Sequence, residues 1–312
     1  MKRIISLLLA LALSLSLAAC AAPAEKADGG KLQIVTTLFP YYDFARAIAQ
    51  DRADVTLLLS PGREAHSFEP TPLDAVTISE ADVFLYNGGE GEYWVESMLD
   101  AAGEHIAVAS RMMDYVDALN EEYVEGMQGA DGHDHDHEHG SHDDHDHDHE
   151  EDEHDSDEIE YDEHIWTSPK NAVVLCRAVC DAICRADAEN AAFYRANCEN
   201  YCAQLEDLDA RFAALCESAP RRLLIFADRF PMLYFCREYG LDYRAAFHGC
   251  SGDTEPSLAT IKFLIDKVED ENIPVVYTID FGTKKVAAVV SECCSDAAEF
   301  ARSSKVSISC TT

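Results

Sequence analysis

The histidines of this sequence are the residues whose type and spacing point most directly to chemistry. Nine of the 13 lie in the run GHDHDHEHGSHDDHDHDHEEDEHD, residues 132–155, among acidic residues. Imidazole nitrogens and carboxylate oxygens bind zinc and related divalent ions, so the run indicates metal binding. It fixes no geometry, however, and a flexible chain loses conformational entropy with every ligand it recruits. We therefore predict an accessory loop that scavenges metal for a site elsewhere or senses excess metal, with a solvated acidic loop as the alternative. Its histidines are His133, His135, His137, His139, His142, His145, His147, His149 and His154.

Two other histidines stand alone in stretches with rigid flanks. His66 lies in SPGREAHSFEPTP, residues 60–72, after an apolar stretch that indicates a strand. Ligand sites in open α/β sheets gather at the carboxyl ends of strands. His164 lies in YDEHIWTSPKN, residues 161–171, just before a proline that opens a helix. A neutral imidazole held in this way is a good zinc ligand. A hydrogen bond to a backbone carbonyl would explain either histidine alone more simply, so the hypothesis of a metal site depends on the pair.

Alternating strands and helices would position these residues. Apolar residues at helical spacing also predict helices over 171–185 and 187–217. The second of these segments contains no Pro or Gly, and a helix of its length would span ~45 Å, so we interpret it as a rigid connector between the lobes. The pattern favours an α/β fold with two lobes, each a parallel sheet with flanking helices. The predicted strands are 32–39, 54–60, 82–87 and 105–109, then 222–227, 241–247, 273–280 and 305–310; the remaining helices are 41–50, 72–81, 92–102, 230–238, 258–267 and 284–292.

The first twenty residues, MKRIISLLLALALSLSLAAC, indicate export. Lys2 and Arg3 precede an apolar stretch that is too short for a comfortable membrane span. Leu17-Ala18-Ala19-Cys20 matches a bacterial lipobox, in which the cysteine is lipidated and becomes the new N-terminus. The alternative is an ordinary secretory signal. We predict a protein outside the cytoplasm, anchored to the cell membrane through Cys20.

These patterns divide the chain into consecutive units. The predicted order is a signal peptide (1–20), a flexible tether (21–30), an N-terminal lobe (31–186) with a disordered His/acidic loop (129–160), a connecting helix (187–217) and a C-terminal lobe (218–312) that ends without a final helix. A chain of 312 residues is long enough for two lobes with cores of their own.

Charge and cysteine content narrow the function classes. The chain has 24 Lys and Arg against 59 Asp and Glu, a net charge of −35, which argues against nucleic acid as a partner. Cys176, Cys180 and Cys184 recur at helical spacing, as do Cys198 and Cys202. Cysteines on one helix face usually behave as small apolar residues. We predict that they pack in a core, with a thiolate metal site or disulfides as the alternative.

Two motifs and their order resemble a known family. Residues 61–72, PGREAHSFEPTP, and 162–171, DEHIWTSPKN, are similar to stretches of the zinc- and manganese-binding solute-binding lipoproteins of ABC transporters. A His/acidic loop between the motifs, a long helix and a lipobox follow the same family order. The resemblance implies two lobes with a metal cleft between them. It also implies an ABC permease in the cytoplasmic membrane as partner.

The resemblance implies four metal ligands, of which the first two correspond to His66 and His164. The family's third histidine is missing, because Ala227 occupies its position. Asp228 beside it is one substitute and His248 is the other. The fourth ligand corresponds to Asp280, after the next strand; a turn-forming Asp is the alternative.

Three function classes follow from these residues. The preferred one is a monomeric receptor that captures Zn²⁺, or alternatively Mn²⁺, between its lobes and delivers it to the permease. The second is an extracellular metal buffer that binds mainly through the His-rich loop. A metal-dependent hydrolase is the third, but the sequence has no HExxH or comparable signature, so we expect no enzymatic activity.

Overall fold

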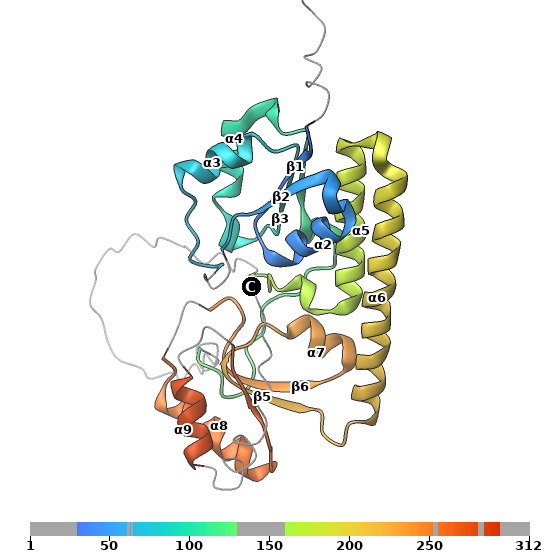
Figure 1. Ribbon diagram of the computed structural model, residues 1–312. Helices are drawn as coiled ribbons and strands as arrows, with labels where there is room; N and C mark the ends of the chain where they lie inside the picture. Colours follow the sequence, from blue (N-terminus) through green and yellow to red (C-terminus); the bar gives the residue numbers. More distant parts are fainter. Residues whose placement is uncertain are drawn as a thin grey trace, which may run out of the picture.

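Two parallel β-sheets, one in each lobe, organise the protein (Figure 1). The computed structural model describes residues 30–60, 63, 65–129, 160–251, 255–279 and 284–293. Cys20, the nine histidines of the acidic run, Asp280 and the predicted strand 305–310 lie outside these ranges. Among the described helices, none combines the length and apolar character that a membrane span requires.

The first sheet contains four parallel strands in the order β2-β1-β3-β4. Its inner strands are almost wholly apolar and buried, as expected for a sheet with helices on both faces. Helix α2 begins with a proline near its N-terminus and buries Tyr41, Phe44 and Ile48 against the sheet. The strands are β1 (Leu32–Thr36), β2 (Ala53–Leu57), β3 (Val83–Tyr86) and β4 (Val108–Arg111); the helices are α2 (Phe39–Ala49), α3 (Pro72–Ser79), α4 (Val95–Ala102) and α5 (Pro169–Ala186).

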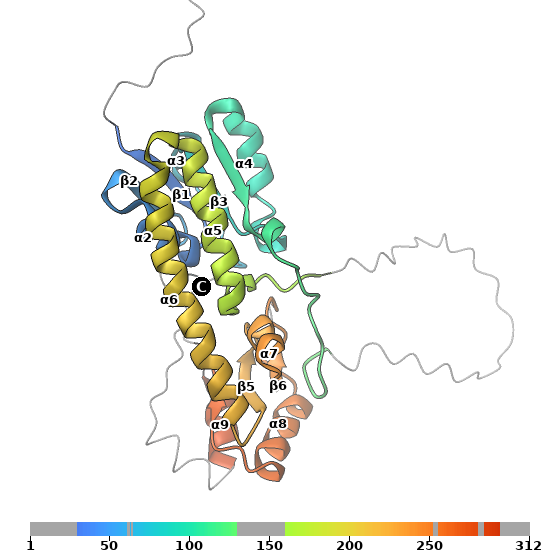
Figure 2. The ribbon, with the colours of Figure 1, turned by 90° about the vertical axis from the view of Figure 1, so that its right-hand side faces the viewer.

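Helix α6 (Ala191–Ser218) runs along both lobes (Figures 1 and 2). In the first lobe the ring of Tyr201 lies 5.7 Å from that of Phe44. In the second lobe the ring of Phe212 lies 5.0 Å from that of Phe235. The predicted connecting helix is therefore confirmed, although its first turn is a separate 3-10 turn, because Asp187 accepts a hydrogen bond from the Asn190 backbone N–H.

The second sheet contains three parallel strands in the order β6-β5-β7. The strands are β5 (Leu223–Arg229), β6 (Asp242–Phe247) and β7 (Val276–Tyr277), and the helices are α7 (Leu233–Tyr239), α8 (Leu258–Asp270) and α9 (Lys285–Cys293). Strand β7 is shorter than predicted, in part because Pro274 has no N–H for the ladder. Helix α7 begins later than predicted, since the residue before Pro231 is disfavoured in a helix.

Short 3-10 turns connect these elements and complete the two-lobed α/β fold predicted from the sequence. They cover Gln50–Arg52, Glu90–Glu92, Gly103–His105, Met112–Tyr115, Ile165–Thr167 and Ala188–Asn190. Two of them, Glu90–Glu92 and Ile165–Thr167, flank the region where the lobes meet, and their residues contribute to the site described next.

Candidate metal centre

His66 and His164 lie side by side in the structure, although 97 residues separate them in the chain. Their ring centroids are 5.6 Å apart, with the rings inclined at 60°. His66 belongs to the loop between β2 and α3, and His164 immediately precedes the turn that leads into α5. The His164 side chain is buried and that of His66 is 16% exposed. The pair singled out in the sequence therefore forms one partly accessible group of imidazoles.

The His164 segment is held rigidly by bonds from both lobes. Asp162 Oδ1 accepts the His164 backbone N–H at 2.7 Å and lies 3.0 Å from His164 Nδ1. Tyr234 of α7, in the second lobe, donates its hydroxyl to the Asp162 carbonyl at 2.8 Å. Ser168 caps α5 by accepting the Asn171 backbone N–H. A carboxylate on Nδ1 orients the ring and leaves Nε2 to bind a metal, as is usual for histidine ligands.

The charge around His164 favours a cation. Burial disfavours the imidazolium, but the carboxylates of Asp162, Glu121 and Glu163 outweigh burial and raise the pKa of His164 above its ordinary value. Asp162 Oδ2 is buried and has no hydrogen-bond partner among the described residues. An uncompensated carboxylate oxygen in such a place is costly unless a positive charge or a water approaches it.

Glu163 links this segment to His66. Its Oε1 accepts the Gly91 backbone N–H at 2.8 Å, and its Oε2 lies 3.9 Å from His66 Nδ1. A Cβ at Gly91 would lie 2.9 Å from Glu163 Oε2 and 3.2 Å from His66 Nδ1, so a larger residue here would push these side chains from their positions. Burial raises the pKa of Glu163. Sequence reasoning missed Glu163 and Asp162 as site residues, although both precede His164 in the motif.

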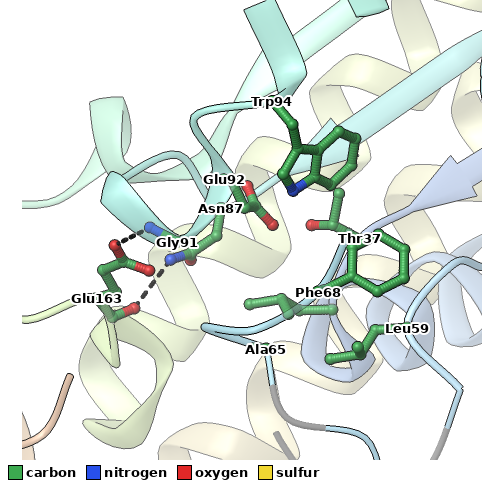
Figure 3. Close-up of a pocket in the computed structure, with 10 residues that line it drawn as sticks. Thr37, Leu59, Ala65, Phe68, Asn87, Gly91, Glu92, Trp94 and Glu163 are labelled. Atoms are coloured by element: carbon green, nitrogen blue, oxygen red, sulfur yellow. Dashed lines mark hydrogen bonds between the residues drawn. The ribbon is translucent and has the colours of Figure 1, made fainter. Parts of the chain in front are cut away.

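A small cavity in the first lobe adjoins the segments that carry the two imidazoles, because Ala65 and Glu163 both line it (Figure 3). Glu163 and Gly91 form one wall of it, and Trp94 and Phe68 form the other. Glu92 also lines it and accepts the Gly88 backbone N–H through Oε2 at 2.7 Å. Burial raises the pKa of Glu92 to about 7. The cavity therefore holds a buried carboxyl group whose pKa is raised toward neutral pH.

The second lobe contributes the loop that follows β6. A Cβ at Gly249 would lie 3.1 Å from His164 Nδ1 and 3.2 Å from Asp162 Oδ2, so the backbone of this loop packs directly against the His164 segment. His248 Nδ1 lies 3.6 Å from Glu121 Oε1, and its ring is 5.0 Å from that of Tyr123. Among the predicted second-lobe ligands, His248 thus adjoins the site but is engaged by the 121–123 segment.

Glu121 and Cys250, which sequence reasoning did not select, fix this loop. Glu121 accepts the backbone N–H groups of Gly249 and Cys250 at 3.3 and 2.9 Å. Burial opposes the Glu121 carboxylate, but hydrogen bonds from His248 and Cys250 prevail and lower its pKa to about 2. Burial raises the pKa of the Cys250 thiol, and the charges of Glu121, Asp162 and Glu163 raise it further. Cys250 therefore faces the same carboxylates as His164.

Asp228 lies near the end of β5. Its Oδ1 accepts the Arg229 backbone N–H at 2.9 Å, and the register between β5 and β6 is interrupted between Phe226 and Arg229. Ala227, at the position of the family histidine, is buried. Asp280 lies outside the described residues. Among the described residues, no three metal-ligand atoms around His164 lie within 4.8 Å of one another. Three sulfur atoms elsewhere meet this criterion; they belong to Cys176, Cys198 and Cys202, between α5 and α6.

Comparison with known proteins gives these residues a context. A sequence model of the family described as zinc-uptake complex component A, periplasmic, matches residues 34–304. The chain is 31% identical over 262 residues to the high-affinity zinc uptake system protein ZnuA of Bacillus subtilis, covering 83% of this chain and 74% of the relative. It is 30% identical over 295 residues to the zinc-binding lipoprotein AdcA of Streptococcus pneumoniae, covering 94% of this chain but 53%, about half, of that relative.

Solved structures agree with the fold. The metal-dependent lipoprotein YcdH from Bacillus subtilis superimposes with a TM-score of 0.65 at 29% identity, over 85% of both chains. The Zn(II)-bound AdcA from Streptococcus pneumoniae gives a TM-score of 0.64 at 25% identity, over 85% of this chain and 50% of that one. The periplasmic zinc-binding protein TroA from Treponema pallidum, at 21% identity and a TM-score of 0.66, shares the fold.

Proposed function

Because this chain belongs to the family of the periplasmic zinc-uptake component A, we propose that it is a lipid-anchored receptor that captures Zn²⁺ between its two lobes and delivers it to an ABC permease. The family comprises zinc-binding transport components and not enzymes, in agreement with the prediction from sequence. The single observation that carries the proposal is that His66 and His164 lie side by side next to the carboxylates of Asp162 and Glu163.

The chemistry of the donors favours zinc as the cargo. Two imidazoles with a nearby Glu163 carboxylate suit an ion of intermediate softness, whereas Mn²⁺ prefers more oxygen ligands. Mn²⁺ remains the alternative cargo. The carboxylates of Asp162, Glu163 and Glu121 would attract either cation and keep the ligands oriented.

The second lobe would complete the coordination. Asp228, Asp280 and His248 remain proposed ligands on the grounds given from sequence. We add Cys250, because the backbone of its loop packs directly against His164 and Asp162. A thiolate would replace the missing family histidine with a donor that zinc binds well and Mn²⁺ binds poorly.

Delivery involves parts of the chain outside the described residues. Lipidation of Cys20 would hold the receptor at the membrane beside its permease. The histidines of residues 132–155 would collect zinc and pass it to the cleft. The competing function is a metal buffer in which this loop binds most of the metal and the cleft binds little.

A calorimetric titration of a variant that lacks residues 131–160 separates the two functions. We expect one tight Zn²⁺ site per chain in this variant, with Zn²⁺ preferred over Mn²⁺ in parallel titrations. His66→Ala and His164→Ala should each abolish it. The buffer function predicts instead that the deletion removes nearly all binding. Equally weak binding by the deletion variant and by both histidine variants would overturn the receptor proposal.

The second-lobe donor is tested in the same background. Cys250→Ser should weaken Zn²⁺ binding more than Asp228→Asn if the thiol is a ligand. The reverse order would assign the position to Asp228, while no loss in either variant would leave Asp280 and His248 for the same measurement.

A further inference from the structure

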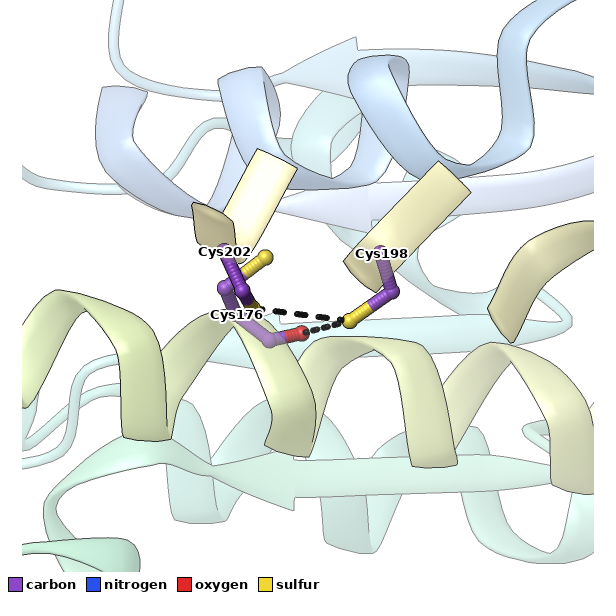
Figure 4. A group of neighbouring side chains, drawn as sticks. All are labelled: Cys176, Cys198 and Cys202. Atoms are coloured by element: carbon purple, nitrogen blue, oxygen red, sulfur yellow. Dashed lines mark hydrogen bonds between the residues drawn. The ribbon is translucent and has the colours of Figure 1, made fainter. Parts of the chain in front are cut away.

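A second group of metal-ligand side chains lies between α5 and α6, away from the cleft (Figure 4). The Sγ atoms of Cys176, Cys198 and Cys202 all lie within 4.8 Å of one another. Cys176 is on α5, and the other two are one turn apart on α6. Their exposures are 0%, 3% and 0%. Three sulfur atoms thus converge in a region from which solvent is excluded.

The spacing of these atoms suits a metal–thiolate site. Two thiolates bound to one zinc ion at about 2.3 Å lie roughly 3.8 Å apart in tetrahedral geometry. Cys198 Sγ and Cys202 Sγ are 3.9 Å apart. Cys180, one turn along α5, is a further buried cysteine near the group, although its Sγ lies 4.0 Å from Cys184 Sγ and outside the set of three. The described cysteines are free thiols, so these sulfurs are available as ligands.

Packing alone offers a different explanation. Cys198 Sγ lies 3.8 Å from the Cys176 carbonyl oxygen, and Cys202 Sγ lies 4.0 Å from that of Val173. Thiols can make these weak bonds without a metal, and buried cysteines commonly serve as small apolar residues. Packing, however, does not require three sulfur atoms from two helices to converge on one point, whereas a closed structural zinc site does require this.

We propose that Cys176, Cys198 and Cys202 form a structural site for one thiophilic ion of the Zn²⁺ class that ties α5 to α6, and that the Cys180 side chain turns toward the group to supply the fourth donor. Binding releases the thiol protons to solvent, and the ion enters as the helix pair folds, because the site is closed to water. The site involves none of the cleft residues, so it is independent of zinc transport.

Cobalt substitution tests the proposal, because Co²⁺ bound to thiolates gives an intense charge-transfer band that imidazole and carboxylate ligands do not give. The full chain is unfolded, reduced, refolded with Co²⁺ and freed of excess metal. In a Cys250→Ser background, which removes the thiol proposed for the cleft, we expect a thiolate band from about one Co²⁺ per chain, its loss in Cys198→Ala, and its retention in Cys236→Ala, a buried cysteine outside the group. Zn²⁺ added during refolding should displace the band. When His164→Ala is also present, so that the cleft does not bind, Zn²⁺ should raise the melting temperature of the chain that keeps Cys198 but not of Cys198→Ala.

Cys250→Ser distinguishes this site from the cleft. The band should be retained in each of the three cleft variants, Cys250→Ser, His66→Ala and His164→Ala. Absence of a thiolate band in reduced wild-type protein, its survival in Cys198→Ala combined with Cys250→Ser, or its loss in Cys250→Ser alone would each overturn the proposal. If Cys198→Ala does not fold, Cys202→Ser takes its place. Comparison of the band in the wild type and in Cys250→Ser still tests the proposal without either variant.

Discussion

The cleft around His164 and the cysteine group between α5 and α6 are both buried and both rich in metal-ligand atoms, but they are assembled differently. The cleft combines loops after β2 and β6, the segment before α5 and a carboxylate from the 121–123 segment. The cysteine group belongs to two consecutive helices packed along their length. Its donors are held by regular backbone, whereas the cleft donors depend on bonds between lobes. A site that must release its ion needs the first arrangement, and a site that only stabilises needs the second.

The sharpest test of this difference is removal of a cleft imidazole. His164→Ala should weaken Zn²⁺ binding at the cleft by about 100-fold or more, because a direct ligand contributes more than the 10–100-fold typical of its supporting partners. Competition against a chromophoric chelator measures the affinity of the chain lacking residues 131–160. His105→Ala, at an exposed position in the first lobe, is the control and should leave the affinity unchanged. A shift in the cobalt–thiolate band of His164→Ala would mean that the two regions are coupled.

The next effect concerns the partner of that imidazole. Asp162→Asn keeps the shape of the side chain but removes the carboxylate charge that faces His164 Nδ1. We expect the Zn²⁺ affinity to fall about 10–100-fold. Asp114→Asn, a surface carboxylate, is the matched control. Equal affinity of Asp162→Asn and wild type would show that the carboxylate does not orient the ligand.

Contact between the lobes distinguishes the cleft from the cysteine group and can be broken at one glycine. Gly249→Ala would place a methyl group 2.9 Å from the Phe230 carbonyl oxygen and 3.1 Å from His164 Nδ1. We expect a loss of about 1–3 kcal/mol in unfolding free energy, the usual cost of overpacking, measured by urea denaturation of the metal-free protein. Gly30→Ala, which meets nothing within 4 Å, should have little effect. Similar losses in both variants would contradict the tight approach of the loop.

The smallest effect is the pH dependence of stability. The pKa of Glu92 is raised from 4.5 to about 7, so the folded state holds its proton more tightly than the unfolded state does. The contribution of Glu92 to the free energy of unfolding is therefore complete below pH 4.5 and is lost as the pH rises through about 7. Glu92→Gln should flatten the fall in unfolding free energy of the metal-free protein across this window. Glu121, with a pKa lowered to about 2, has the opposite sign, and Glu121→Gln should not flatten it.

The sequence predicted the regular part of the molecule better than the irregular part. Hydrophobic periodicity located the long helix and the order of strands, because burial on one face follows the repeat of the backbone. The pairing of His66 and His164 was implied by the resemblance of their two motifs to the zinc- and manganese-binding solute-binding lipoproteins. Glu121 and Cys250 could not be found in this way, since they lie in irregular segments whose positions depend on tertiary contacts.

The cysteines show the same limit at a finer scale. Their i, i+4 spacing correctly placed Cys176, Cys180 and Cys184 on one buried face of α5 and Cys198 and Cys202 on one buried face of α6. The relative rotation and shift of the two helices decide which sulfur atoms meet. Sequence periodicity fixes neither, so the convergence of three of them emerges only in the structure.

Helix α6 has a consequence for timing. Because one continuous helix packs on both lobes, hinge bending between the lobes is limited. If the chain is the receptor proposed above, an arriving ion would meet a protein already near its bound shape, and little of the binding free energy would be spent on reorganisation. How long the ion stays bound would then depend on local rearrangement of the loops that carry His66 and Gly249 rather than on separation of the lobes.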